Sequence, residues 1–198
     1  MIDVKTQIPR QGLSALARRY RGIRSQGRPL LFLDLDDVLC LNDPYGGNHL
    51  RLPTSEQPTD LWDRIWHPPS MQVLRTVFEE FAPHLIMTTS WLRFMERDGF
   101  VSLFKRTGLP VLGQSFHHAW EAPQGYGTTR LEAIDAWLAV HYEGQPLVIL
   151  DDVQSGSGLR GSRLEKAGCV VLCDSGVGLS GEHLRCIRSA LGQTVRAP

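Results

Sequence analysis

The hydrophobic residues of this chain gather in short unbroken runs, without the alternation of apolar and polar positions that marks a half-exposed strand. Such runs are typical of strands that are covered on both faces, as in a parallel sheet between two layers of helices. The predicted strands cover residues 30–34, 84–89, 109–114, 146–152 and 169–174.

Between most of these runs, apolar residues recur every three or four positions, which predicts amphipathic helices. The predicted helices cover residues 71–82, 93–108, 130–142 and 181–192. Strands and helices that alternate in this way predict an open parallel α/β sheet with helices on both faces. Ligands of such sheets bind beyond the carboxyl ends of the strands, so polar residues at these ends are the first candidates for chemistry.

The chain of 198 residues is long enough for one domain with a sizeable core. We expect this domain to span residues 29–198 and to carry a docked basic helical segment at residues 1–28. Apolar residues at helical spacing between Leu13 and Ile23 predict that helix. The net charge of the chain is zero, but residues 1–30 carry one Lys and six Arg against one Asp, so the basic excess is local.

The four cysteines show no Cys or Cys/His spacing of a metal site and lie in apolar stretches, which favours reduced, packed thiols. They are Cys40, Cys169, Cys173 and Cys186. The chain does not open with the apolar core of a signal peptide, and no segment approaches the length of a membrane span. We therefore expect a cytoplasmic location and no membrane partner.

The stretch "LFLDLDDVLC" places Asp34, Asp36 and Asp37 at the end of the first predicted strand. Two full charges about 4 Å apart repel by about 4 kcal/mol at an effective dielectric constant near 20, so a bound cation is expected between carboxylates gathered so closely. Asp34 and Asp36 are two positions apart, which directs both side chains to the same side of an extended strand. One carboxylate can then attack while its protonated neighbour acts as general acid and later as general base.

A second pair of acids, Asp151 and Asp152, ends the predicted strand at residues 146–152. Together the carboxylates offer an all-oxygen site. A site made of a few carboxylates and water molecules suits Mg²⁺ best. The sequence therefore predicts a Mg²⁺ site at the carboxyl edge of the sheet.

Four motifs in order resemble those of the haloacid dehalogenase (HAD) superfamily of phosphotransferases: "DLDDVL", "LIMTTSW", a basic residue ahead of a helix, and "LVILDD". The resemblance covers residues 29 to about 192. It implies the α/β class with a three-layer Rossmann-like HAD fold and a parallel central sheet. It also implies a Mg²⁺-dependent phosphatase, a phosphomonoester hydrolase that forms an aspartyl-phosphate intermediate.

The resemblance also implies a role for each motif residue. Asp34 is expected to be the nucleophile, and Asp36 the general acid and base. The expected Mg²⁺ ligands are Asp34, the backbone carbonyl of Asp36, and Asp151, with Asp152 as an outer or alternative ligand.

Thr89 is expected to bind the phosphoryl oxygens, although Thr88 and Ser90 on either side leave this register open. Arg130 is expected to offset the phosphate charge. It departs from the superfamily pattern, in which this residue is usually Lys. A second departure is Asp37, which occupies a position that is often Gly and whose side chain either faces solvent or joins the outer ligands of the metal.

A narrower likeness is to the HAD domains that occur in, or are related to, multi-domain RNA-repair proteins. Those domains also have a Trp after the second motif and a late "VGL" followed by Ser or Thr. Here these features are Trp91 in "TTSWLR" and the stretch "GVGLSGEHL". Packing of a helix would explain Trp91 equally well.

Two other patterns compete with this interpretation. The stretch "GSGLRG" at residues 156–161 fits a dinucleotide-binding fingerprint, but it starts too late after the strand and leaves no room for a full crossover helix. The adjacent His117 and His118 suggest a metal site, but neighbouring side chains point apart and no third ligand is suitably spaced, which favours a plain loop.

The stretches between the motifs, residues 36–84 and 91–129, are too short for an independent cap domain with its own core, so we expect no large cap and an open crevice. An open site admits a bulky phosphorylated substrate, and the arginines at residues 10–28, together with Arg160 and Arg163, could contact a phosphodiester backbone. We therefore predict a nucleotide or a nucleic-acid end as substrate.

The alternative function is a catalytically silent HAD-fold binding or regulatory protein, against which the intact Asp34, Asp36 and Asp151 argue. The sequence leaves the oligomeric state open.

Overall fold

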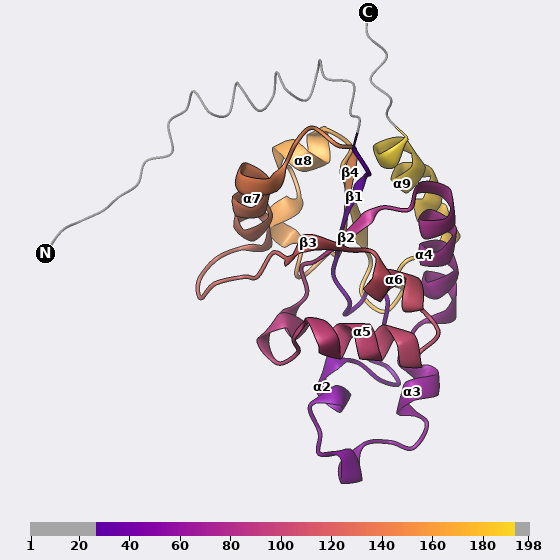
Figure 1. The fold of residues 1–198 in the computed structure, drawn as a ribbon. Coiled ribbons are helices and arrows are strands. Elements are labelled where there is room, and N and C mark those ends of the chain that lie inside the picture. Colours follow the sequence, from indigo (N-terminus) through magenta and orange to yellow (C-terminus); the bar gives the residue numbers. More distant parts are fainter. Residues whose placement is uncertain (1–26, 193–198) are drawn as a thin grey trace, which may run out of the picture.

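A five-stranded parallel sheet forms the middle layer of the protein in the computed structural model, which describes residues 27–192 (Figure 1). The spatial order of the strands is β3-β2-β1-β4-β5. Their bounds are Leu30–Leu33 for β1, His84–Met87 for β2, Phe116–Glu121 for β3, Leu147–Asp152 for β4 and Val170–Cys173 for β5. The predicted helix between Leu13 and Ile23 lies outside the described residues, so its docking stays a prediction.

Helices cover both faces of the sheet, as the apolar runs predict. The longer ones are α4 (Pro68–Phe81), α5 (Arg97–Arg106), α7 (Arg130–His141) and α9 (Leu184–Leu191). Leu31 and Leu33 of β1 pack on the face that α4, α5 and α9 cover, whereas Leu30 and Phe32 pack on the face of α7. Figure 1 shows α7 and α8 (Arg163–Lys166) on one side of the strands and α4 and α9 on the other. The three-layer Rossmann-like fold is therefore confirmed.

The segment between β1 and α4 folds as short turns and makes no separate cap domain. Its elements are α2 (Gly47–Leu50), the 3-10 turn η1 (Thr54–Glu56) and α3 (Leu61–Arg64). These pieces lie beyond α5 at the lower end of Figure 1, where the chain leaves the carboxyl end of β1. The remaining 3-10 turns are η2 (Ser90–Arg93), η3 (Ser157–Leu159) and η4 (Gly181–His183).

The prediction of a strand at residues 109–114 is wrong, because this stretch forms the helix α6 (Pro110–Gln114). Proline stands in the first turn of α6, where its fixed φ suits a helix and its missing N–H is not needed. The edge strand β3 instead comes from residues 116–121, where the sequence pattern predicts no strand. Four of the six residues of β3 are exposed or half-buried, so this edge strand lacks the unbroken apolar run of the strand beside it.

The predicted helix at residues 93–108 is shorter than expected, since η2 ends at Arg93 and α5 begins at Arg97. The helix predicted at residues 71–82 begins earlier, at Pro68.

None of the helices in the described part of the chain is long and apolar enough to cross a membrane. All four cysteines are free; three are buried, but Cys186 is exposed on α9, which corrects the expectation that it is packed.

Candidate active site at the carboxyl edge of the sheet

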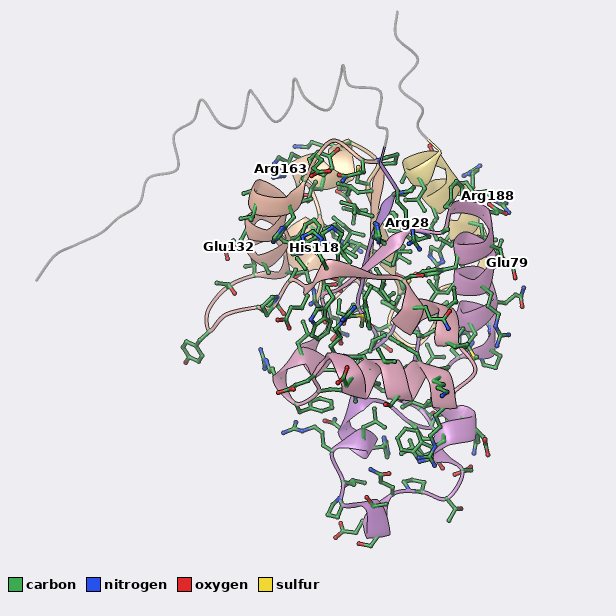
Figure 2. The ribbon with its side chains drawn as sticks, viewed as in Figure 1. Arg28, Glu79, His118, Glu132, Arg163 and Arg188 are labelled. Atoms are coloured by element: carbon green, nitrogen blue, oxygen red, sulfur yellow. The ribbon has the colours of Figure 1, made fainter. Side chains whose placement is uncertain are left out.

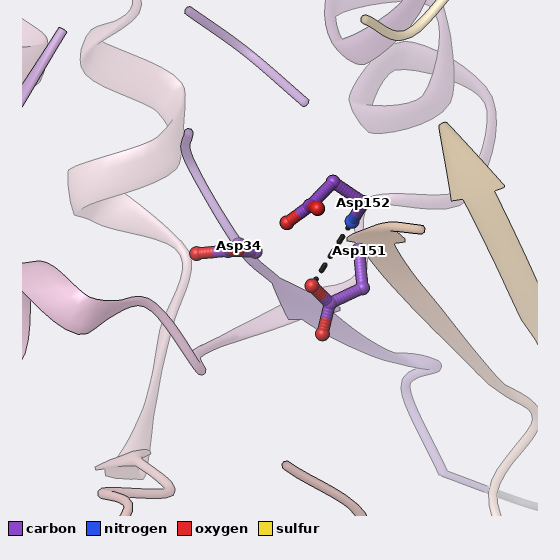
Figure 3. A group of neighbouring side chains, drawn as sticks. All are labelled: Asp34, Asp151 and Asp152. Atoms are coloured by element: carbon purple, nitrogen blue, oxygen red, sulfur yellow. Dashed lines mark hydrogen bonds between the residues drawn. The ribbon is translucent and has the colours of Figure 1, made fainter. Parts of the chain in front are cut away.

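The pairing of β1 with β4 brings the two predicted acidic motifs together. Leu33 of β1 is in register with Leu150 of β4, and the backbone N–H of Asp34 donates to the Leu150 carbonyl at 3.0 Å. The next residue of β4 is Asp151, which therefore lies beside Asp34. Carboxylate oxygens of Asp34, Asp151 and Asp152 all lie within 4.8 Å of one another, and the three side chains are buried (Figure 3).

The N-terminus of α7 places a guanidinium against this cluster. The hydroxyl of Thr129 accepts from the backbone N–H of Glu132 at 3.2 Å, and the Glu132 carboxylate accepts from the N–H of Thr129 at 2.8 Å. This reciprocal capping determines where α7 starts, so Arg130 is its first residue. Arg130 Nη2 lies 3.0 Å from Asp34 Oδ2, and Arg130 Nε lies 2.7 Å from Asp151 Oδ2.

Burial dominates the electrostatics of the cluster. It raises the pKa of Asp34, an effect that the positive charge of Arg130 opposes. The pKa of Asp151 lies well above its ordinary value, first because of burial and next because of the neighbouring Asp34 charge. When the three carboxylates are ionised, they outnumber the single guanidinium by two charges, so the cluster calls for a further cation.

The donor set fits a divalent metal. Asp34 Oδ1 and Asp151 Oδ2 are buried oxygens without a hydrogen-bond partner among the described residues. The Arg130 Nε–H is close to Asp151 Oδ2 but lacks hydrogen-bond geometry. Carboxylate oxygens with this unused capacity are the ligands that Mg²⁺ prefers. One oxygen of Asp152 already has hydrogen-bond partners: Oδ1 accepts from the backbone N–H groups of Gln154 at 2.7 Å and Ser155 at 3.0 Å.

Asp36 has surroundings of its own and is not part of the three-carboxylate cluster. Its Oδ2 accepts from the indole N–H of Trp91 at 2.9 Å, and its Oδ1 accepts from the backbone N–H of Gly47 at 3.3 Å. The Cys40 thiol also donates to Oδ1, at 3.5 Å. The Asp36 side chain is thus oriented by donors from three segments of the chain. The metal contact expected through the Asp36 backbone carbonyl stays a prediction.

The three candidate phosphoryl-binding residues after β2 have different environments. Thr89 is buried, and its hydroxyl caps η2 by accepting from the Trp91 backbone N–H at 3.3 Å. A hydrogen bond from Thr89 to Asp34 is also among the effects that lower the pKa of Asp34. Thr88 is also buried, but its hydroxyl has no hydrogen-bond partner among the described residues. Ser90 is exposed. The structure thus places Thr89 beside the predicted nucleophile, while its role stays a prediction.

The remaining candidates lie outside this cluster. Arg160 is exposed at the end of η3, and Arg163 is paired with Asp135 of α7 at 2.8 Å. The Asp37 carboxylate accepts from the backbone N–H of Gly176 at 3.2 Å and thereby contacts the loop after β5. The stretch at residues 156–161 carries only the turn η3, which agrees with the rejection of a dinucleotide site.

The adjacent His117 and His118 belong to the edge strand β3, so the expectation of a plain loop is corrected. The Nδ1 atom of His117 accepts from the Ala119 backbone N–H at 3.1 Å. Within residues 27–192, the acids, histidines and cysteines close enough together to hold a metal ion are Asp34, Asp151 and Asp152.

Sequence reasoning missed the part that Trp91 and Gly47 play in holding Asp36. Trp91 is fully buried and stacks on Trp66 with a centroid distance of 5.8 Å, so it is a packing residue as well as a donor. A side chain at Gly47 would bring a Cβ within 2.3 Å of the Trp91 indole nitrogen. Glycine is therefore required for this close approach, and the pair of glycines in "YGGN" was the signal available in the sequence.

The parallel α/β sheet has Asp34, Asp151 and the buried guanidinium of Arg130 together at its carboxyl edge. This arrangement is that of a protein of the HAD superfamily. The family model described as "HAD domain in Swiss Army Knife RNA repair proteins" matches residues 30–184, and the chain belongs to this family. The narrower likeness to HAD domains of RNA-repair proteins is thereby confirmed. No curated protein and no solved structure matched the chain. Membership of the family supports a phosphatase-like function.

Proposed function

We propose that the protein is a Mg²⁺-dependent phosphomonoester hydrolase that works through an aspartyl-phosphate intermediate. The observation that carries this proposal is the buried Asp34 carboxylate, held between Arg130 and the Asp151–Asp152 pair at the end of the central strand. A fold that uses charge for stability alone would gain little by burying three carboxylates around one guanidinium, because removing charges from water is costly.

The chemistry divides between the two aspartates of the first motif. An oxygen of Asp34 forms a bond to phosphorus while the bond from phosphorus to the leaving oxygen breaks, and Asp36 donates its proton to that oxygen. Asp36 then takes a proton from water, which attacks the phosphorus, releases inorganic phosphate and restores the Asp34 carboxylate. The donors from Trp91 and Gly47 hold Asp36 in the orientation that both proton transfers need.

Arg130 and the metal would counter the negative charge of the phosphoryl group. Arg130 lowers the pKa of Asp34 against the effect of burial, which favours the ionised form that attacks. Asp34, Asp151 and Asp152 would hold Mg²⁺ with the backbone carbonyl of Asp36, and the metal supplies charge stabilisation at the transferring group when it is bound. Thr89 would donate to a phosphoryl oxygen.

For the substrate, we propose a nucleotide or a nucleic-acid end. Support comes from the family name and from the short elements α2 and α3, which leave the site without an independent cap domain. Arg28 does not contribute to this support. Its guanidinium, labelled in Figure 2, donates to the carbonyls of Ala82 and Pro83 and to Ser115, and Arg28 precedes the start of β1, whereas the aspartates follow its end. The arginines between residues 10 and 24 lie outside the described residues.

The test is a screen for Mg²⁺-dependent phosphate release from nucleotides, sugar phosphates and end-phosphorylated oligonucleotides, with Asp34→Asn as the decisive variant. The amide keeps the shape but is a poor nucleophile, so turnover should fall by several powers of ten, each equivalent to about 1.4 kcal/mol of barrier. Asp98→Asn, at an exposed aspartate of α5, is the matched control and should keep parental turnover. Near-parental turnover of a correctly folded Asp34→Asn protein would contradict the proposal.

A further inference from the structure

A second space lies beside Asp36, separate from the cluster of three carboxylates. It is a cavity of about 70 Å³ whose walls come from the segment after β1 and from the turn after β2. The side chains that matter for its chemistry are those of Asp36, Asn42, Asn48, Arg51, Ser90 and Phe94. The proposed mechanism assigns no role to any of these residues except Asp36.

The position of the cavity relates it to the leaving group. A general acid must reach the leaving oxygen, so the atoms attached to that oxygen have to lie next to the Asp36 carboxylate. The attacking and leaving oxygens are also roughly in line through phosphorus, which directs the leaving group away from Asp34. The cavity that Asp36 lines is therefore where the leaving alcohol would be received.

The walls combine one cation, one aromatic ring and several neutral polar groups. Arg51 is exposed, and no ion pair among residues 27–192 includes it. Its guanidinium carbon lies 5.6 Å from the centroid of the Phe94 ring, which is itself 39% exposed. An arginine without a carboxylate partner suits a phosphate, and an exposed ring beside it suits a base. Asn42, Asn48 and Ser90 offer donors and acceptors for hydroxyl groups.

The size of the cavity limits what it encloses. Its volume of about 70 Å³ is well below the roughly 300–1,000 Å³ of pockets that enclose a drug-sized ligand, so it takes the atoms around the scissile bond and not a whole nucleoside. A larger leaving group must extend along the exposed Arg51 and Phe94 at the rim. A small sugar phosphate would leave both of these side chains without a contact.

We propose that this cavity is the leaving-group subsite, that the leaving nucleoside extends from it along the exposed Phe94, and that Arg51 binds the second phosphate along the chain from the terminal phosphate. This inference rests on the proposed function and deepens it. The substrate class is then a terminally phosphorylated oligonucleotide, because a mononucleotide has no second phosphate for Arg51. The base next to the terminal phosphate lies against Phe94.

The kinetic test compares a terminally phosphorylated dinucleotide with the matching mononucleotide at two salt concentrations. The parental protein should have the higher kcat/KM on the dinucleotide, and this preference should weaken at high salt. Arg51→Gln should lower the preference about tenfold or more, as expected for a hydrogen bond between charged groups. Arg185→Gln, at an exposed arginine of α9 that does not line the cavity, is the matched control and should leave the preference unchanged. An Arg51→Gln variant that keeps the parental preference would overturn the subsite.

A binding measurement separates failure of the subsite from failure of the proposed function. The dissociation constant of the dinucleotide is measured with Asp34→Asn protein, with and without Arg51→Gln, so that no turnover is required. We expect the second substitution to weaken binding about tenfold or more. Equal dissociation constants would overturn the subsite even if phosphatase activity is found. A protein without phosphatase activity that still loses affinity through Arg51→Gln would overturn the proposed function and support the subsite.

Discussion

At the scale of single residues, the contacts of Arg130 show what an arginine adds at the position where the superfamily usually has lysine. Its planar guanidinium lies 3.0 Å from an Asp34 oxygen with one nitrogen and 2.7 Å from an Asp151 oxygen with another. A lysine ammonium is a compact point charge on a flexible stem, whereas the rigid planar guanidinium places separate nitrogens next to the two carboxylates at once. The substitution therefore changes how the cluster is held together, beyond supplying a positive charge.

The residue that orients Asp36 gives a direct test of the acid and base assignment. Trp91→Phe keeps an aromatic ring against Trp66 but removes the N–H that donates to Asp36 at 2.9 Å. We expect kcat to fall about tenfold or more, since a hydrogen bond to a charged group contributes about 1.5–3 kcal/mol, while KM changes little. The measurement is steady-state kinetics together with the pH–rate profile.

Trp66→Phe is the matched control for that prediction. It also removes a buried indole and one hydrogen bond, here to the Thr107 hydroxyl at 2.6 Å. Both variants should lose stability, but only Trp91→Phe should lose kcat and change the pH–rate profile. If the two variants lose kcat equally, the effect of Trp91 is packing alone.

At the scale of elements, the turn after β4 determines where the metal-binding carboxylates lie. Gly156 is buried directly behind them, and a Cβ there would lie 2.7 Å from the Asp152 carbonyl oxygen and 3.1 Å from the Asp151 Cβ. Gly158, two residues later in the same turn, would bring a Cβ no nearer than 3.7 Å to Thr129. The turn therefore contains one glycine that the packing requires and one that it does not.

We expect Gly156→Ala to destabilise the protein by about 1–3 kcal/mol, the usual effect of overpacking, and to displace Asp151. Gly158→Ala should be neutral or stabilising by up to about 1 kcal/mol, because alanine restricts the unfolded chain. Urea unfolding and Mg²⁺ titration of both variants test this. Equal free energies of unfolding for the two variants would show that the turn tolerates a side chain at Gly156.

At the scale of the whole molecule, the burial of acidic charge makes the stability of the fold depend on pH and on metal. Burial raises the pKa of Asp34 and of Asp151 above the ordinary value of 3.8. The folded protein therefore binds these protons more tightly than the unfolded chain does. The stability that these protons provide is present at low pH and is lost as the pH rises from about 4 through the raised pKa values.

Mg²⁺ competes with the same protons, so its stabilising effect should have the opposite pH dependence. At a concentration of 100 times the dissociation constant, Mg²⁺ should add about 2.7 kcal/mol to the free energy of unfolding, and this gain should shrink as the pH falls. Thermal unfolding with and without Mg²⁺ across the acidic pH range measures the gain. A gain that grows toward low pH would contradict the assignment of the cluster as the metal site.

Two variants show which acid holds the metal. Asp151→Asn should abolish more of the Mg²⁺-dependent gain than Asp152→Asn does. The reason is that Asp151 Oδ2 has no hydrogen-bond partner among the described residues, whereas Asp152 Oδ1 accepts from two backbone N–H groups. Equal losses in the two variants would mean that the two carboxylates share the ion.

By itself, the sequence determined the class of the fold and the position of the aspartates at strand ends. Strands that are covered on both faces appear as apolar runs, and the residues that follow each run lie at the carboxyl edge. These properties depend on neighbours along the chain. The four runs that became β1, β2, β4 and β5 were predicted on this basis, as were Asp34 and Asp151.

Only the tertiary structure decided which distant groups meet. The bond from Trp91 to Asp36 joins residues 55 positions apart, and the cavity beside Asp36 needs both Arg51 and Phe94 from separate segments. The exchange of a predicted strand at residues 109–114 for the edge strand β3 has the same origin, because incomplete covering weakens the local pattern. Contacts of this kind depend on how whole elements pack, which no pattern of neighbouring residues specifies.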